Sequence, residues 1–279
     1  MNTKVLAERL AVCSWSLQPK HLADLLAKLA ACGLRRVQLA LDPLRQSPQL
    51  WSQTDSLFRQ NQIRIVSGMF ACVGEDYSTP QTIRLTGGLA PDATWAQNRQ
   101  NIQETVALAA RLGLNLVTFH AGFLPPRESD PDYAKMLHRI AEVASRFAPA
   151  GISLGLETGQ ETAPALAALL QKLDRPNLGV NFDPANLVLY NQGNPIAALR
   201  VLAPWIRQVH IKDGLRPKAA GVWGEEVAAG RGEVDWPAFF ATLRQGNFAG
   251  NFVIEREAGG RRIPDIIAAR EVVERNLAS

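Results

Sequence analysis

The sequence is poor in cysteine and has little excess charge. Its three cysteines, Cys13, Cys32 and Cys72, form no CxxC pair, which excludes a disulfide scaffold and argues against a structural zinc site. We therefore predict reduced thiols and a cytoplasmic protein. The net charge is +4 over 279 residues and is spread along the chain, which is too weak to indicate a nucleic-acid partner.

Long hydrophobic runs and a dinucleotide motif are also absent. No stretch of about 18 apolar residues occurs, so we predict that no segment spans a membrane. The N-terminal residues carry charges at Lys4, Glu8 and Arg9 without an apolar centre, so we expect no signal peptide. The segment SWSLQPK, which follows the first predicted strand, lacks the GxGxxG pattern of dinucleotide-binding folds.

What the sequence does contain is an alternation of short β-branched runs with helical stretches. Helical patterns cover segments such as 20–32, 97–112, 131–147 and 162–172. The predicted strands are 10–16, 35–41, 64–70, 115–121, 152–158, 178–184, 207–213 and 251–257.

Eight strand–helix units in a chain of this length predict an α/β fold, a single (β/α)8 TIM barrel over residues 1–279. A doubly wound open sheet is the alternative, and the missing glycine motif disfavours it. The gaps 72–96 and 214–235 are too long for ordinary loops of such a fold. We expect them to form lids or walls of a functional site.

The last four predicted strands place polar residues at equivalent positions. In ISLGLET the apolar residues alternate with small or polar ones, and Glu157 ends the polar face. LGVNFDP and NFVIERE repeat this pattern with Asp183 and Glu255, and RQVHIKD adds His210. Barrel enzymes build their sites at the C-terminal ends of the strands, so we expect these four side chains to converge there.

Three carboxylates and one imidazole form an oxygen-rich ligand set. Without a cation, three carboxylates in one pocket would repel one another and raise a pKa. We therefore predict that Glu157, Asp183, His210 and Glu255 bind one divalent ion, Mn²⁺, Mg²⁺ or Co²⁺, with Zn²⁺ as a further option. Glu257 shares the alternation of Glu255 and remains an alternative fourth ligand, although it lies beyond the expected end of the strand.

Other polar residues are candidates for contact with a substrate. His120 ends the fourth predicted strand, and Lys212 alternates with His210 and should face inward. Asn186 could contact substrate or cap the turn that follows Asp183. We expect Asp213 to orient the following turn rather than to bind metal.

The motifs LGLET, GVNFDPANLVLY, VHIKDGLR, GRGEVDW and FVIERE resemble the sugar-phosphate isomerase/epimerase family of xylose isomerase-like TIM barrels. The resemblance extends over most of the chain and is strongest from about residue 150 to the end. In the ketose 3-epimerases of this family, the equivalents of the four ligands bind one divalent ion. The two glutamates there, here Glu157 and Glu255, also move the proton on opposite faces of the sugar. Arg216, six residues after His210, matches an arginine that contacts substrate in those enzymes.

The resemblance implies an isomerase or epimerase of a small sugar or sugar phosphate, acting through a metal-stabilised enediolate. Dimers or tetramers are frequent in the family, so a homo-oligomer is expected. Two positions depart from the epimerases: Asn186 replaces a histidine and Ala163 replaces a second glutamate. Both differences leave the substrate open.

Three alternatives share this barrel. The first is a dehydratase of the inosose or dehydroshikimate type, in which the same intermediate expels a hydroxyl group. The second is a barrel that binds a sugar without converting it. The third is a DNA-repair endonuclease, which needs three zinc ions and several more histidines. The chain has only four histidines, and His21 and His138 fall in helical patterns, so the endonuclease is disfavoured.

Overall fold

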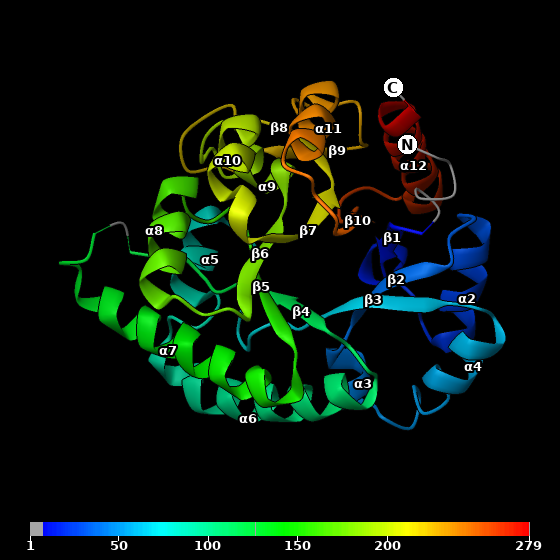
Figure 1. Ribbon diagram of the computed structural model, residues 1–279, viewed down its shortest axis with the longest axis horizontal. Coiled ribbons are helices and arrows are strands. Elements are labelled where there is room, and N and C mark those ends of the chain that lie inside the picture. The colour runs from blue at the N-terminus through cyan, green and yellow to red at the C-terminus, as the bar shows by residue number, and fades with distance from the viewer. Residues whose placement is uncertain (1–7, 126, 279) are drawn as a thin grey trace.

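The computed structural model describes residues 8–125 and 127–278 and has a closed barrel of eight parallel strands at its centre (Figure 1). The prediction about the N-terminal segment, which rests partly on Lys4, concerns residues outside the described part. Around the barrel the order is β1-β10-β7-β6-β5-β4-β3-β2, so each strand lies beside its neighbour in the chain. The barrel strands are β1 (Leu10–Cys13), β2 (Arg36–Ala40), β3 (Arg64–Met69), β4 (Leu116–Phe119), β5 (Ser153–Glu157), β6 (Leu178–Phe182), β7 (Ile206–Ile211) and β10 (Asn251–Ile254).

The (β/α)8 barrel is therefore confirmed, but several predicted strands end too late. The first stops at Cys13 rather than at residue 16, because Trp15–Leu17 form the 3-10 helix η1. The seventh stops at Ile211, because the next residues pair in an antiparallel hairpin of β8 (Asp213–Leu215) and β9 (Glu225–Val227).

The eighth predicted strand ends at Ile254 rather than at residue 257. The reason is that side chains accept the hydrogen bonds of the backbone N–H groups beyond Glu255, so these groups do not pair with a neighbouring strand. That of Arg256 donates to Ser16 Oγ and that of Glu257 donates to Glu226 Oε1.

The helices cover the outside of the barrel, with α6 and α7 side by side along one flank and α12 close to the end of β10 (Figure 1). The helix predicted at 97–112 begins earlier, at Asp92, where the acidic side chain suits the first turn. The helices are α2 (Leu22–Ala31), α3 (Asp42–Gln46), α4 (Thr54–Gln60), α5 (Pro80–Thr86), α6 (Asp92–Arg111), α7 (Pro131–Phe147), α8 (Ala163–Leu173), α9 (Pro184–Leu189), α10 (Pro195–Leu202), α11 (Trp236–Gln245) and α12 (Arg262–Ala278), with the 3-10 turns η2 (Ala148–Ala150) and η3 (Ala203–Trp205).

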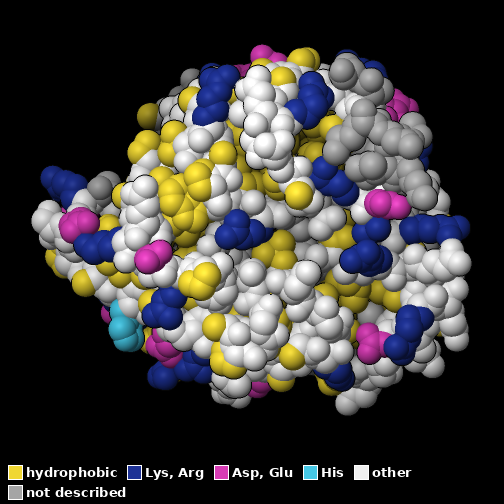
Figure 2. All heavy atoms as spheres, viewed as in Figure 1, with side chains coloured by type: hydrophobic (Ala, Val, Ile, Leu, Met, Phe, Trp, Pro, Cys, Tyr) yellow, Lys and Arg dark blue, Asp and Glu magenta, His cyan; other side chains and the backbone are white. Residues whose placement is uncertain are grey.

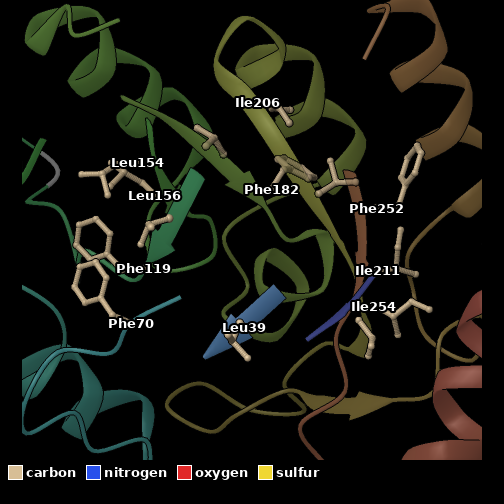
Figure 3. Packing of buried hydrophobic residues seen from close by; sticks show 14 of the residues in the cluster. Leu39, Phe70, Phe119, Leu154, Leu156, Phe182, Ile206, Ile211, Phe252 and Ile254 are labelled. Carbon is tan, nitrogen blue, oxygen red and sulfur yellow. The ribbon is translucent and has the colours of Figure 1, made fainter. Parts of the chain in front are cut away.

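The main hydrophobic core lies between the barrel and its helices. Leu154 and Leu156 of β5 belong to it, as the alternation of ISLGLET predicts (Figure 3). Phe70 and Phe119 stack there with ring centroids 4.8 Å apart. The outward side chains of the strands thus supply the apolar contacts, and this leaves the inward face free for polar groups.

The interior of the barrel has a different character. Its hydrophobic part is a small cluster of Ala11, Cys13, Val66 and Val253. Polar side chains that are almost completely buried fill much of the rest: Gln38, Ser67, Thr118, Asn181, Gln208 and His210. Buried polar groups of this kind need hydrogen-bond partners, and their partners lead to the candidate site.

On the face shown in Figure 2, Lys and Arg side chains are dispersed among acidic and neutral ones rather than gathered in one basic patch. Among the helices of the described residues, none combines the length and the apolar character needed to cross a bilayer.

Candidate metal centre

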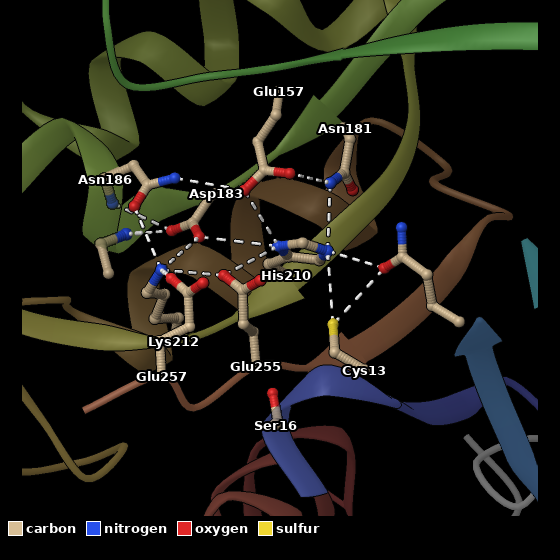
Figure 4. Close-up of polar contacts among 12 residues, drawn as sticks. Cys13, Ser16, Glu157, Asn181, Asp183, Asn186, His210, Lys212, Glu255 and Glu257 are labelled. Atoms are coloured by element: carbon tan, nitrogen blue, oxygen red, sulfur yellow. Dashed lines mark hydrogen bonds and ion pairs between the residues drawn. The ribbon is translucent and has the colours of Figure 1, made fainter. Parts of the chain in front are cut away.

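The four predicted metal ligands meet at the C-terminal ends of β5, β6, β7 and β10. Glu157 is the last residue of β5, Asp183 directly follows β6, His210 lies in β7, and Glu255 directly follows β10. One ligand atom from each lies within 4.8 Å of those of the other three, and all four residues are buried. The imidazole points into the middle of the three carboxylates (Figure 4). The alternation of the strands therefore predicts their convergence correctly.

The ring nitrogen Nδ1 of His210 is the centre of this cluster. It lies 3.4 Å from Glu157 Oε1, 3.6 Å from Asp183 Oδ2 and 3.3 Å from Glu255 Oε2. Such distances exceed those of good hydrogen bonds and leave space between the groups. Accordingly, Nδ1 has no hydrogen-bond partner among the described residues, although it is buried.

Asp183 shows the same feature. Its Oδ1 accepts hydrogen bonds from the backbone N–H groups of Ala185 (2.8 Å) and Asn186 (3.0 Å) and so caps α9. Its Oδ2 is buried and has no hydrogen-bond partner among the described residues. Two orphaned buried atoms that face one another, an imidazole nitrogen and a carboxylate oxygen, are donors of the kind that bind divalent cations. The residues present therefore fit a metal ion.

Electrostatic interactions keep the two glutamates ionised. Burial alone would raise the pKa of Glu255, but the charges of Lys212 and His210 outweigh burial and hold that pKa well below its usual value. Burial opposes ionisation of Glu157 as well, and there His120 and His210 lower the pKa. For Asp183 burial prevails over Lys212 and His210, and its pKa is raised.

Lys212 is the cation closest to the cluster. Its Nζ lies 2.9 Å from Glu255 Oε2 and 2.6 Å from Glu257 Oε2, and it donates to Asn186 Oδ1 over 3.3 Å. Burial would lower the pKa of Lys212, but the negative charges of Glu255 and Glu257 raise it well above its usual value. The ammonium group is thus already paired within the protein.

Asn186 joins two of these groups. Its Nδ2 donates to Glu157 Oε1 over 3.2 Å, while its Oδ1 accepts from Lys212. Its backbone N–H also takes part in the cap of α9. Gly159 permits the close approach, since a Cβ there would lie 2.4 Å from the Cβ of Asn186. Asn186 therefore combines the two roles that the sequence leaves open, a place in the site and a place in the turn.

Two further side chains, those of Trp15 and His120, contact the two glutamates. The indole N–H of Trp15 donates to Glu255 Oε1 over 2.8 Å. The Nε2 atom of His120 lies 3.6 Å from Glu157 Oε1. Both rings line a pocket above the cluster, and through them the two glutamates are coupled to its walls.

The pocket has a volume of about 650 Å³, which suits a small molecule. Its wall combines aromatic rings, among them Tyr190 and Trp223 in edge-to-face contact at 4.8 Å, with several carboxylates. The residues that line it are Trp15, Ala40, Asp42, Met69, Phe70, Ala71, Glu75, Tyr77, His120, Asn186, Leu189, Tyr190, Lys212, Trp223, Gly224, Glu226, Glu257 and Ala258. Both long segments predicted to form walls, 72–96 and 214–235, contribute to it.

The structure separates candidates that the sequence leaves together, first the two glutamates and then the residues predicted to contact substrate. Glu255 lies in the cluster, whereas the side chain of Glu257 is 53% exposed and pairs with Lys212 at the pocket wall. Arg216, predicted to contact substrate, is not among the lining residues, and its guanidinium pairs with Glu233 over 3.0 Å on the outer loop. His120, Asn186 and Lys212 do line the pocket.

Asp213 organises the loop rather than the cluster, as expected. Its carboxylate accepts hydrogen bonds from the backbone N–H groups of Gly230 and Val234 and from the indole of Trp236. A Cβ at Gly232 would lie 2.1 Å from Asp213 Oδ1, so only glycine fits beside the carboxylate.

The polar residues beneath the cluster are not among the site residues predicted from the sequence. Gln38 Oε1 lies 2.8 Å from Nε2 of His210, and Gln208 Nε2 donates to both Gln38 and Asn181. The sequence does contain a sign of them, because Gln38 and Gln208, like His210, are polar residues in otherwise apolar strand segments. The wall residues Glu75 and Tyr77 have no such signal, since they lie in a long connection.

Comparisons with known proteins agree with the geometry. The family model described as xylose isomerase-like TIM barrel matches residues 26–276. An uncharacterized protein of Escherichia coli (strain K12), YihM, is 30% identical over 154 residues. That match covers 54% of this chain and 46% of the relative, so it spans about half the length of the curated protein.

Solved structures resemble the whole barrel. A xylose isomerase domain protein from Planctomyces limnophilus is 31% identical with a TM-score of 0.80, over 91% of this chain and 89% of the other. The probable 3-DHS dehydratase AsbF from Bacillus anthracis is 18% identical (TM-score 0.72, covering 95% and 98%). An L-ribulose 3-epimerase is 17% identical (TM-score 0.75, covering 97% and 94%). The dehydratase and the epimerase share the fold of this chain.

Proposed function

The chain belongs to the xylose isomerase-like TIM barrel family, and from this membership and the geometry of the site we propose that it is a metal-dependent isomerase or epimerase of a small sugar. The observation that carries the proposal is the buried cluster of Glu157, Asp183, His210 and Glu255, in which one imidazole nitrogen and one carboxylate oxygen face each other without hydrogen-bond partners. An epimerase and a dehydratase among the structural neighbours agree with this class of chemistry.

We propose that these four side chains hold one divalent ion, with Mn²⁺, Mg²⁺ and Co²⁺ best suited to three carboxylates and one imidazole. When bound, the ion supplies Lewis-acid stabilisation of negative charge on substrate oxygens. The protein positions the ligands beforehand. The cap of α9 orients Asp183, and Asn186 and Trp15 orient the two glutamates.

Glu157 and Glu255 are the proposed proton carriers. A carboxylate can accept a proton from carbon only while it is ionised, and the lowered pKa values of both residues keep them in that state. Each also keeps contact with the pocket wall, Glu157 beside His120 and Glu255 beside Trp15. One glutamate would remove the proton next to a carbonyl group, and the other would return a proton to the sugar.

The charges of the wall favour a free sugar over a sugar phosphate. Asp42, Glu75, Glu226 and Glu257 line the pocket, and among the described lining residues there is no arginine. The single lysine of the lining, Lys212, already contacts Glu255 and Glu257. A phosphate group would therefore meet carboxylates and find no unpaired cation.

The test is metal analysis combined with solvent deuterium exchange. We expect about one divalent ion per chain and deuterium incorporation into an unphosphorylated ketose from a panel of ketoses, their phosphates and inososes. Glu157→Gln should abolish the exchange. Loss of water from an inosose would reassign the protein to the dehydratases. Tight metal binding without exchange on any compound would identify a barrel that binds sugars without converting them.

A further inference from the structure

A chain of hydrogen bonds crosses the interior of the barrel below the metal ligands. It involves side chains from five strands, all 1% exposed or less: Gln38, Ser67, Thr118, Asn181 and Gln208. Its donors and acceptors are 2.7 to 3.1 Å apart. The chain begins at Glu157 and ends at the ring of His210, and Figure 4 shows its first member, Asn181, between the two.

The direction of each hydrogen bond in this chain follows from the carboxylate of Glu157, whose two oxygens face the side-chain amides of Asn181 and Asn186. Because that carboxylate can only accept, the group of Asn181 that faces it must be the NH₂ group, at 3.0 Å. Asn181 Oδ1 then accepts from Gln208 Nε2 over 3.1 Å. The remaining oxygen of Gln208 accepts from the hydroxyl of Ser67 over 2.7 Å.

The same reasoning orients Gln38. Gln208 Nε2 also donates to the amide of Gln38 over 3.0 Å, so the atom of Gln38 that faces it must be the oxygen. The NH₂ group of Gln38 points the other way and donates to Thr118 Oγ1 over 2.7 Å. The atom that lies 2.8 Å from Nε2 of His210 is therefore an acceptor and cannot donate to the ring.

We propose that Gln38 is a positioning residue that keeps the proton of His210 on Nε2. An Nε2–H group donates to Gln38 Oε1, whereas an unprotonated Nε2 would direct its lone pair at that oxygen. Nδ1 is then the only ring nitrogen that can give up its proton, and it is the nitrogen that faces the carboxylates. The polar interior thus prepares His210 to bind a cation through Nδ1.

Two neighbours of the ring are compatible with the opposite assignment. The thiol of Cys13 lies 3.8 Å from Nε2, but its single hydrogen has an acceptor in Gln38 Oε1 at 3.5 Å. Asn181 Nδ2 also lies 3.0 Å from Nε2, and it could donate to that nitrogen if the proton were on Nδ1. The bond to Glu157 uses only one of the two hydrogens of Asn181 Nδ2 and does not decide the matter. The argument against the opposite assignment is that the shorter contact of Nε2, 2.8 Å, is the one to Gln38 Oε1, which can only accept. The two assignments differ in which nitrogen keeps its hydrogen when the ring is neutral, and this can be measured directly.

The first readout is nitrogen-15 NMR of the histidine rings in the metal-free protein and in the protein saturated with Mg²⁺. The chain has four histidines, and His210→Gln identifies the signals of His210 by their loss. The metal-free spectrum is recorded at a pH at which the ring of His210 is neutral, and we expect the proton on Nε2 in both states, protected from exchange. An Nε2 without a proton in the metal-free protein would overturn the proposal. This readout does not require that the protein bind metal, so it stands apart from the proposed function on which the inference rests.

The second readout is the affinity for Mn²⁺, measured by electron paramagnetic resonance. Gln38→Leu removes the acceptor, and we expect the dissociation constant to rise about 10- to 100-fold. Gln38→Glu keeps an acceptor in the same place and should restore affinity to within a few-fold. Ser67→Ala, which removes a bond at the far end of the chain, is the matched control and should have little effect.

The outcomes separate the two proposals. If the wild-type protein shows the Nε2 proton but binds no Mn²⁺, the proposed metal site fails and the assignment of the ring proton is supported. If Gln38→Leu is folded and binds Mn²⁺ as tightly as the wild type, the positioning role of Gln38 is overturned. If Gln38→Leu does not fold, Gln38→Glu and the NMR of the wild type decide.

Discussion

The ammonium group of Lys212 lies 2.9 Å from Oε2 of Glu255, and the two side chains are 4% and 2% exposed. This buried ion pair connects the pocket wall to the cluster of proposed metal ligands, because Lys212 also contacts Glu257 at the wall. Its charge holds the pKa of Glu255 well below the usual range, against burial, which would raise it. The chemistry proposed for Glu255 therefore depends on a residue that is not itself a ligand.

Removing this charge should shift the dependence of activity on pH. In Lys212→Met the pKa of Glu255 rises, so the carboxylate becomes protonated at a higher pH. The acid limb of the profile of kcat/KM should therefore move upward in pH. Breaking the buried pair should also lower the free energy of unfolding by about 3–5 kcal/mol. Lys172→Met is the control, since Lys172 pairs with Glu128 at the surface. An unchanged profile in folded Lys212→Met protein would contradict this role.

Metal binding should stabilise the fold measurably. A Mn²⁺ concentration of about 100 times its dissociation constant adds about 2.7 kcal/mol, which for a domain of this size raises Tm by roughly 5–10 °C. Asp183→Asn should abolish the increase while leaving the metal-free protein nearly as stable, because asparagine also caps helices well. Asp235→Asn, at the cap of α11, should retain the full increase. Calorimetry with and without a chelator measures the difference.

The two tryptophans of the pocket should differ in importance. Trp15→Phe removes the N–H group that donates to Glu255 Oε1, so we expect kcat to fall by about tenfold, the equivalent of one hydrogen bond to a charged group. Trp223→Phe keeps an aromatic wall, and the N–H of Trp223 is buried without a hydrogen-bond partner among the described residues. Its replacement should change kcat little. Equal losses in the two variants would show that the bond to Glu255 is unimportant.

Asp213 should be needed for the loop that covers one side of the pocket. Asp213→Ala leaves the donors of Gly230, Val234 and Trp236 without their acceptor, and we expect a loss of about 3 kcal/mol or more in the free energy of unfolding. Asp235→Ala removes one capping bond and should cost about 1 kcal/mol. Urea denaturation of the two variants gives the comparison, and equal costs would contradict the role of Asp213.

The barrel and the four converging residues are predictable from the sequence because both follow from short-range patterns. A period of two sets the face of Glu157 and His210, and the parallel topology of a barrel brings the C-terminal ends of the strands together. Arg216 could not be placed in this way. Its position depends on the β8–β9 hairpin and on Glu233, which is 17 residues further along the chain.

The choice between Glu255 and Glu257 also needed the fold. Both residues lie on the same face of the predicted strand. Only the end of β10 at Ile254 shows which of them belongs to the cluster. That end is set by side chains from distant segments, Ser16 and Glu226, which bind the backbone beyond it. Tertiary contacts of this kind leave no mark in the local sequence pattern.

Glu161 should make the protein less stable as pH rises. It lies in the loop between Glu157 and α8, is 8% exposed, and burial raises its pKa from 4.5 to about 8. The folded protein therefore keeps this proton over a range in which the unfolded chain has lost it. Since the folded state binds more protons there, the free energy of unfolding falls as pH rises from about 4.5 to about 8.

Glu161→Gln replaces the carboxylate by a neutral amide of similar shape and should remove this part of the pH dependence. We expect a gain on the order of a few kcal/mol above pH 8 and almost none near pH 4.5. Glu271→Gln, an exposed change on α12, is the control and should leave the difference between the two pH values as in the wild type. Urea denaturation across this range measures it. A wild-type slope retained in Glu161→Gln would mean that other groups whose pKa is raised in the folded state, such as Glu75 or His210, cause the loss.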